Sequence, residues 1–490
     1  MARIPGQRRL LPLVAAGLLA GVLACSPSQF TGGGSGQGNR RLTPPPETPR
    51  PGTPGPSVQG TPVAGGPVRL RGQGLTSGDL YVAYRAMLDN YVDPINNSQL
   101  VQAAQDSLRQ GLENQPVLPM YSLPLSLVPP PSGNTEKDWQ GFGDAYDAVT
   151  NKLPDWAQTA HPDWMVLKAM ADSVHDGHTS FLTPDEARRR SETSFAGIGV
   201  VLSRPQDNQP PLITEIFPNS PAASSGLKRG DRIVAVDGQE IGGKTVADVA
   251  QLIRGQSGTS VRIRVQRLNS PQPQEFTLRR AQVQVEQVVA RQVGNSPIAY
   301  LRIRSFQDDA ASQQALSILQ RGRQIGVRAW VLDLRGNPGG ALQAVLSLAA
   351  GFMDQNHAVV GYEVDRQRHQ TPLTTQPLNL IEGTPMVALI DHDTASGAEI
   401  LAAALKEANV APLIGARTAG SVGVASQLAM PDGSVLQVTE QRFVSPSGAQ
   451  LDGAGVAPDT QVDITDEDLQ NGRDPPLERA VQTLAQKLGV

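Results

Sequence analysis

The stretch Asp391–Glu399 reads Asp-His-Asp-Thr-Ala-Ser-Gly-Ala-Glu and follows the apolar segment Pro385–Ile390. The apolar segment predicts a buried strand, and the residues after Ser396 continue in a helical pattern. Upstream, Asp333–Gly340 reads Asp-Leu-Arg-Gly-Asn-Pro-Gly-Gly and follows a second apolar segment, Arg328–Leu332. A serine hydroxyl at a helix start, beside amides that glycines leave exposed, is how an acyl-transfer site is assembled. The two stretches therefore predict an α/β fold with a serine nucleophile.

The surrounding residues 285–490 alternate strand and helix patterns. A strand is expected at Ile298–Ile303, and helices are expected at Asp309–Gln324, from Gly340 to Met353 and in the tail from Pro475 to Leu488. Such alternation is typical of layered α/β domains. We therefore predict one α/β domain over residues 285–490.

Residues 191–280 show short strands separated by turns. Strands are expected at Phe195–Leu202, Leu212–Ile216 and Val261–Val265, with a short helix near Pro221 and another from Val246 to Arg254. Their order and spacing resemble a PDZ domain, a short β-barrel with helices. Such a domain binds a peptide C-terminus as an added strand, with the carboxylate held at a glycine turn. The residues predicted to do so are Phe195, Gly197, Ile198, Gly199 and Val200.

The N-terminal part reads as a targeting segment followed by a spacer and a helical domain. Arginines precede the apolar segment Leu10–Leu23, which leads into Cys25, the one cysteine of the chain. Residues 1–25 resemble a bacterial lipoprotein signal with lipidation at Cys25, although an ordinary signal peptide is the alternative. Residues 26–75 are rich in Pro, Gly and Ser and predict a disordered linker. Residues 76–190 predict a mostly helical domain, with helices around 79–88, 100–112 and 164–175.

In order and content, these motifs resemble the carboxyl-terminal processing peptidases, also called tail-specific proteases. The resemblance implies a crotonase-like α/β spiral for the catalytic core and Ser396 as the nucleophile. It also implies an oxyanion hole from Gly397 and the Asn-Pro-Gly-Gly turn, with Gly340 preferred over Gly339. Taken singly, Ser396 could merely cap a helix and the glycines could merely shape a turn.

The general base departs from the pattern common in that family. Where the family has Gly-x-x-Thr-x-Gly-Lys-Gly, this chain has Ser421 in place of the lysine. Lys406 lies ten residues beyond Ser396, about 15 Å along a helix, and cannot substitute. Relatives that resemble the tricorn protease core use a histidine instead, which nominates His178 as base and Asp452 as the residue that orients it. His178 could equally be structural.

Composition limits the remaining possibilities. A formal net charge of -4 argues against nucleic acid as a partner, and the six histidines are scattered without metal-ligand spacing. We expect no cofactor and no metal. The sequence predicts a lipid-anchored, extracytoplasmic serine endopeptidase of the bacterial cell envelope that takes peptides with apolar C-termini. The alternative is a catalytically inactive peptide-binding envelope protein on the same fold; a third hypothesis, an apolar-ligand carrier, has no support from the low aromatic content.

Overall fold

A computed structural model describes residues 74–490, except 114–129, 152–160, 192–193, 204–208 and 382. The predicted signal with Cys25 and the predicted linker up to residue 73 lie outside the described residues. Within the described ranges, no helix is both long enough and apolar enough to cross a membrane.

The N-terminal region is helical, as predicted. Its elements are α1 (Ser77–Asn90), α2 (Asn97–Glu113), α3 (Thr135–Thr150), α5 (Pro162–Asp172) and α6 (Pro184–Ser191). Thr76 caps the N-terminus of α1, where its hydroxyl and the Asp79 carboxylate form a capping box. Tyr84 of α1 stacks on Trp139 of α3 at a centroid distance of 4.6 Å, and both rings are buried. This aromatic contact joins α1 to α3, a helix absent from the sequence prediction.

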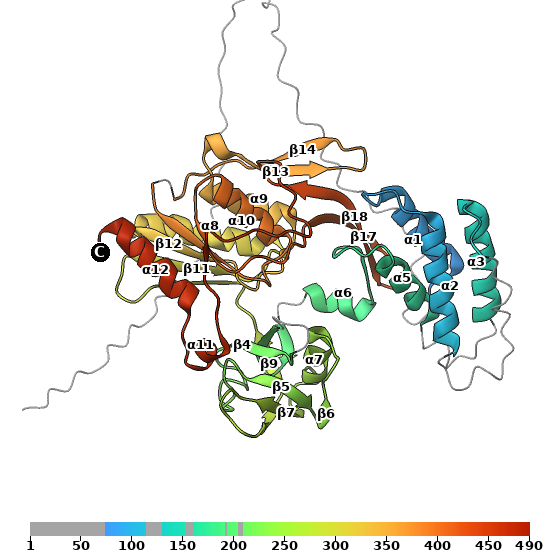
Figure 1. Cartoon of the computed structure of the whole chain (residues 1–490), viewed down its shortest axis with the longest axis horizontal. Coiled ribbons are helices and arrows are strands. Elements are labelled where there is room, and N and C mark those ends of the chain that lie inside the picture. Colours follow the sequence, from blue (N-terminus) through green and yellow to red (C-terminus); the bar gives the residue numbers. More distant parts are fainter. Residues whose placement is uncertain (1–73, 114–129, 152–160, 192–193, 204–208, 382) are drawn as a thin grey trace, which may run out of the picture. The chain divides into compact units, whose positions relative to one another are not determined.

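The end of this region joins the C-terminal sheet. The short strand β1 (Ser180–Leu182) pairs antiparallel with β18 (Val435–Val444), with Phe181 opposite Leu436. Figure 1 shows β18 alongside α1 and α5, and these elements share one hydrophobic cluster. This pairing brings a segment that precedes the PDZ-like region in sequence against the C-terminal domain.

The PDZ-like region is a small β-barrel with one helix. Its elements are β2 (Ser194–Gly197), β3 (Val200–Ser203), β4 (Leu212–Ile216), β5 (Arg232–Val236), β6 (Gln239–Glu240), α7 (Val246–Ile253), β7 (Ser260–Gln266), β8 (Gln274–Arg279) and β9 (Ala281–Gln284). The predicted single strand Phe195–Leu202 is wrong, because Gly199 has φ +80° and separates β2 from β3. The short helix expected near Pro221 is a series of turns.

The C-terminal domain is built around a mostly parallel sheet in the order β10-β11-β12-β15-β16-β19. Its strands are β10 (Val288–Gln292), β11 (Ile298–Ile303), β12 (Ala329–Asp333), β15 (Met386–Ile390), β16 (Leu413–Gly415) and β19 (Thr460–Gln461). One face packs on α8 (Asp309–Gln324), α9 (Leu342–Phe352) and α10 (Gly397–Glu407), and the other on α12 (Pro475–Leu488) (Figure 1). The predicted α/β layering is confirmed.

A second sheet lies beside the first and was not predicted. It contains β1, β18, β13 (Val359–Val364) and β14 (Gln370–Thr374), with β17 (Gly423–Ala429) paired to β18. Two short helical turns, η3 (Gln355–His357) and α11 (Asp466–Gln470), complete the domain. Since β17 begins two residues after Ser421, this sheet carries the loop in which the sequence departs from the lysine pattern.

Candidate active site

Ser396 lies between β15 and α10, where the chain turns sharply. Its φ of 53° and ψ of −124° are values that side-chain-bearing residues seldom adopt. Such a conformation costs on the order of 1–3 kcal/mol and persists only where the surroundings hold it. A serine on a strained strand-to-helix turn is the backbone arrangement of a nucleophile elbow, which agrees with the role predicted for Ser396.

The Asn-Pro-Gly-Gly turn packs directly against this serine. A Cβ on Gly339 would lie 2.7 Å from Ser396 Cβ and 2.6 Å from the Gly397 nitrogen, so only glycine permits this approach. The Gly339 amide donates to Asn337 Oδ1 at 2.8 Å. Among the described residues, no hydrogen bond uses the amides of Gly340 and Gly397. Of the predicted oxyanion donors, Gly340 and Gly397 therefore have N–H groups available, whereas the Gly339 amide is occupied.

A fully buried carboxylate, that of Glu399, joins Ser396 to the loop before β17. It accepts hydrogen bonds from the amides of Ser396 at 3.0 Å, Gly420 at 2.8 Å and Ser421 at 2.9 Å. It also accepts one from the Thr418 hydroxyl. A buried charge is tolerated only with such partners. Sequence reasoning missed Glu399, although its spacing three residues after Ser396 is that of a capping box.

The structure brings His178 to Ser421 rather than into a hydrogen bond with Ser396. His178 Nε2 lies 3.2 Å from Ser421 Oγ. The Ser421 carbonyl in turn accepts the Ser396 amide at 2.8 Å. His178, Ser421 and Ser396 thus form one contiguous cluster, with Ser421 in the middle. In the part of the chain that is described, no hydrogen bond joins the His178 ring directly to Ser396.

The loop that carries His178 is fixed by Asp176. The Asp176 carboxylate accepts the His178 amide at 2.7 Å and the Thr179 hydroxyl at 2.8 Å, and the Thr179 hydroxyl also accepts the amide of Thr439 in β18 at 3.1 Å. Burial alone would raise the pKa of Asp176, but the hydrogen bonds from Thr179 and His178 outweigh it and lower that pKa. The rival histidine, His175, is exposed and has φ 55°.

Asp452 does not make the contact predicted for it. Its carboxylate is exposed and lies 3.4 Å from the amide of Val422, and no hydrogen bond within the described ranges connects it to His178. The reason is the fold of its own loop, since the Gly453 amide donates to the Gly420 carbonyl at 2.7 Å and directs Asp452 toward Val422. Asp452 is thus not bonded to His178 in this structure, and its orienting role stays a prediction.

The other polar candidates are engaged elsewhere. Lys406 Nζ donates to the Ala457 carbonyl at 2.7 Å and lies 3.1 Å from Asp459. These contacts hold the ammonium group away from Ser396, as the sequence predicts. His392 Nε2 lies 3.1 Å from the hydroxyl of Ser203, at the end of β3. The described residues contain no group of three or more potential metal ligands.

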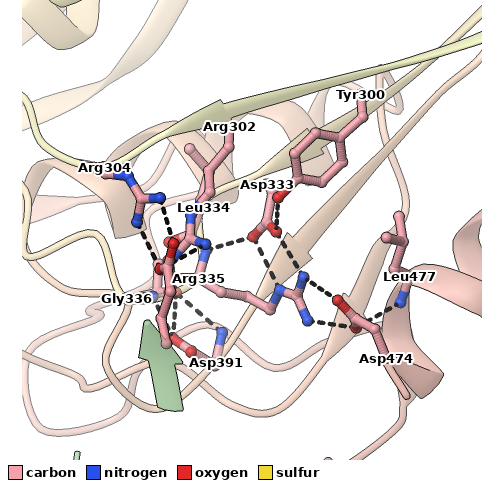
Figure 2. Close-up of polar contacts among 12 residues, drawn as sticks. Tyr300, Arg302, Arg304, Asp333, Leu334, Arg335, Gly336, Asp391, Asp474 and Leu477 are labelled. Carbon is pink, nitrogen blue, oxygen red and sulfur yellow. Dashed lines mark hydrogen bonds and ion pairs between the residues drawn. The ribbon is translucent and has the colours of Figure 1, made fainter. Parts of the chain in front are cut away.

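A buried network of ion pairs and hydrogen bonds surrounds Asp333 and Arg335, at the start of the stretch Asp333–Gly340 (Figure 2). Asp333, at the end of β12, accepts from Tyr300 Oη at 2.7 Å and from the Arg335 guanidinium at 2.6 and 2.9 Å. Arg335 also donates to Asp474, which caps α12. Burial would raise the pKa of Asp333, but the charge of Arg335 and its hydrogen bonds hold it well below its ordinary value. The Gly336 amide donates to Asp391 at 2.9 Å, which links this turn to the serine turn.

The PDZ-like region contacts the C-terminal domain through β4. Glu215 of β4 accepts two hydrogen bonds from Arg304 and lies 3.0 Å from Arg302 of β11 (Figure 2 labels both arginines). A cavity of about 790 Å³ adjoins this contact and is lined by residues of both regions, including Asp391 and His392. Ser396 is not among the lining residues, so the cavity lies beside the turn that carries Ser396 and does not contain the serine itself.

The predicted peptide-binding turn has an open strand edge. β3 is the terminal strand of its sheet, with β4 on one side only. The carbonyls of Ile198 and Gly199 accept from Ala222 at 2.8 Å and from Phe217 at 2.9 Å. Phe195 and Val200 are half-buried, whereas Ile198 is 1% exposed and packs in the domain core rather than on an open surface. An added strand could pair with β3.

Comparisons with known proteins agree with this architecture. The family model "Peptidase family S41" matches residues 297–462, and the "PDZ domain" model matches residues 212–267. A probable CtpA-like serine protease of Staphylococcus haemolyticus is 29% identical over 65% of this chain and 63% of its own length. The chain is therefore similar to the carboxyl-terminal processing peptidases. A protein of the same name from Staphylococcus aureus is 28% identical over 61% of this chain and 59% of its own length. This chain thus spans less than two thirds of the length of the curated relatives first matched.

The family fold extends over most of the chain. The solved photosystem II D1 C-terminal processing protease superposes with a TM-score of 0.51 at 23% sequence identity, covering 84% of this chain and 97% of its own. At this identity the likeness concerns the fold alone. It agrees with the predicted fold, in which a helical region is followed by a PDZ domain and an α/β core.

Proposed function

We propose that this chain is a serine endopeptidase that binds protein C-termini through its PDZ domain and hydrolyses peptide bonds at Ser396. The observation that carries the proposal is a cluster of three segments around Ser396: the Gly339–Gly340 turn and the Ser421 loop contact Ser396, and the His178 loop contacts Ser421. Each comes from a different part of the sequence, and helix capping alone would require none of them.

In the proposed reaction, the Ser396 oxygen attacks the substrate carbonyl carbon as its proton passes toward His178. The amides of Gly340 and Gly397 donate to the oxygen that becomes negative, and the N-terminus of α10 stabilises the same charge. Collapse of the tetrahedral intermediate breaks the C–N bond, and the departing amine takes up the proton. Water then hydrolyses the acyl ester by the same steps.

The PDZ domain would select the substrate. A peptide C-terminus pairs with β3, and its carboxylate lies at the Gly197–Gly199 turn with an apolar side chain near Phe195 and Val200. The leader and Cys25 support a lipid-anchored protein of the bacterial cell envelope, so that the substrates are envelope proteins.

Peptide hydrolysis by the purified chain tests the proposal. Cleavage of peptides ending in apolar residues is measured for the parent, Ser396→Ala and His178→Ala. We expect both variants to lose at least about 10²-fold in kcat/KM, as removal of a nucleophile or base does. The exposed His175→Ala serves as the matched histidine control. A parent no more active than Ser396→Ala would leave the inactive peptide-binding protein as the better account.

A further inference from the structure

The residue between His178 and Ser396 is itself a serine. Ser421 stands where the resemblance described above implies a lysine, and its side chain makes one hydrogen bond among the described residues, to His178 Nε2 at 3.2 Å. Its backbone bonds are separate: the amide donates to Glu399 at 2.9 Å, and the carbonyl accepts Ser396 at 2.8 Å. The main chain therefore fixes Ser421 next to the nucleophile, while its hydroxyl faces the imidazole.

We infer that the Ser421 hydroxyl relays the proton between Ser396 and His178, an inference that rests on the proposed function. In acylation, Ser421 Oγ takes the proton of Ser396 Oγ and at the same time gives its own proton to His178 Nε2. The Ser396 oxygen forms its bond to the carbonyl carbon, and the carbonyl electron pair moves to the oxygen facing Gly340 and Gly397. When the C–N bond breaks, the proton returns through the same hydroxyl to the leaving amine.

A hydroxyl suits this position because it is at once a donor and an acceptor. A lysine here would act as base itself and leave His178 without a role, whereas an alanine would leave the imidazole without a partner. The relay requires the Ser396 hydroxyl to turn toward Ser421 when substrate binds, which is consistent with catalytic hydrogen bonds that tighten only in the substrate complex. The loop of His178 is independently anchored through Asp176 and Thr179, so Ser421 is not needed to hold that backbone.

The test compares Ser421→Ala and Ser421→Thr with the parent in the full chain. Since the backbone hydrogen bonds of Ser421 do not involve its hydroxyl, both variants should unfold at nearly the parental temperature. We expect Ser421→Ala to lose on the order of 10²-fold in kcat with little change in KM, and Ser421→Thr to recover most of that loss. Ser426→Ala, which removes a hydroxyl five residues further along in β17, is the matched control.

Solvent isotope measurements separate a relay from a purely structural hydroxyl. The parent should show a curved dependence of kcat on the deuterium fraction, because two protons move together, whereas residual turnover of Ser421→Ala should show a linear dependence. A Ser421→Ala variant within about twofold of the parent overturns the relay while Ser396-dependent hydrolysis keeps the proposed function. A parent that is no faster than Ser396→Ala overturns both.

Discussion

Replacement of Glu399 by glutamine gives the sharpest test of how this site is held. The carboxylate is fully buried, and its two oxygens accept from the Ser396, Gly420 and Ser421 amides and the Thr418 hydroxyl. One oxygen faces Thr418 and Gly420, and the other faces Ser396 and Ser421. Glutamine keeps the shape but has one acceptor oxygen, so some of these donors must lose their partner.

The better glutamine orientation directs its oxygen at Ser396 and Ser421. Its NH₂ group can then donate to the Thr418 hydroxyl, but the Gly420 amide is left unsatisfied, at a cost of about 1–3 kcal/mol. The two retained bonds also change from charge-assisted to neutral, at about 1 kcal/mol each. Together these terms predict a destabilisation of roughly 3–5 kcal/mol. Because the variant shifts the 418–421 loop against Ser396, kcat should fall with it.

Urea unfolding followed by circular dichroism measures the free energy, and peptide hydrolysis measures kcat. Glu407→Gln is the matched control, because Glu407 lies on the same helix and accepts the Ser447 amide at 2.7 Å near the surface. That change should cost less than about 1 kcal/mol. If Glu399→Gln is as stable as Glu407→Gln, the desolvation cost of the buried charge equals what its hydrogen bonds return, and the anchoring argument is wrong.

Two further predictions concern the buried ion pair and the peptide-binding turn. Asp333→Asn leaves Arg335 without its main partner and should lower the free energy of unfolding by about 3–5 kcal/mol at pH 7. Because the pKa of Asp333 is lowered in the folded state, the stabilisation by its carboxylate is present above about pH 4 and is lost as pH falls further. Urea midpoints across pH check this, and an equal deficit at pH 3 and pH 7 contradicts it. Gly199→Ala places a Cβ 2.2 Å from Ser220 Cβ at φ +80°, so affinity for a labelled peptide with an apolar C-terminus should drop at least about tenfold. Gly238→Ala, at φ +83°, would bring its Cβ no closer than 3.8 Å to a neighbour, the Arg262 guanidinium, and so carries only the backbone cost of about 1–2 kcal/mol. Equal losses of affinity in both variants would remove the steric argument.

The sequence was sufficient for the elements whose pattern is local. Strand β11 and helices α8 and α12 have the predicted bounds, because each shows regular apolar spacing between clear start and stop signals. The break between β2 and β3 was missed, since the apolar residues on both sides of Gly199 read as one strand. The glycines in that run permit a left-handed conformation, but they do not by themselves show that the strand ends at Gly199.

The site shows where local patterns stop being informative. Ser396 and the glycine turn could be nominated because each follows an apolar strand, and the strands of a parallel sheet end at one edge. The position of His178 depends instead on β1 pairing with β18, a contact across more than 250 residues that no periodicity encodes. Asp452 was assigned to the histidine by motif, but the three-dimensional path of its loop directs it to Val422.

Ser421 illustrates the difference between a missing residue and a missing function. In the sequence it marks only the absence of a lysine, and that absence by itself favours an inactive protein. In the structure, Ser421 contacts His178 through its hydroxyl and Ser396 through its backbone carbonyl. Ser421 therefore connects the His178 imidazole to Ser396. The imidazole of His178 is bonded to the Ser421 hydroxyl, and the buried Glu399 carboxylate accepts the Ser421 amide, so the polar groups around this position have partners. The geometry therefore favours a changed route for the proton over a lost one.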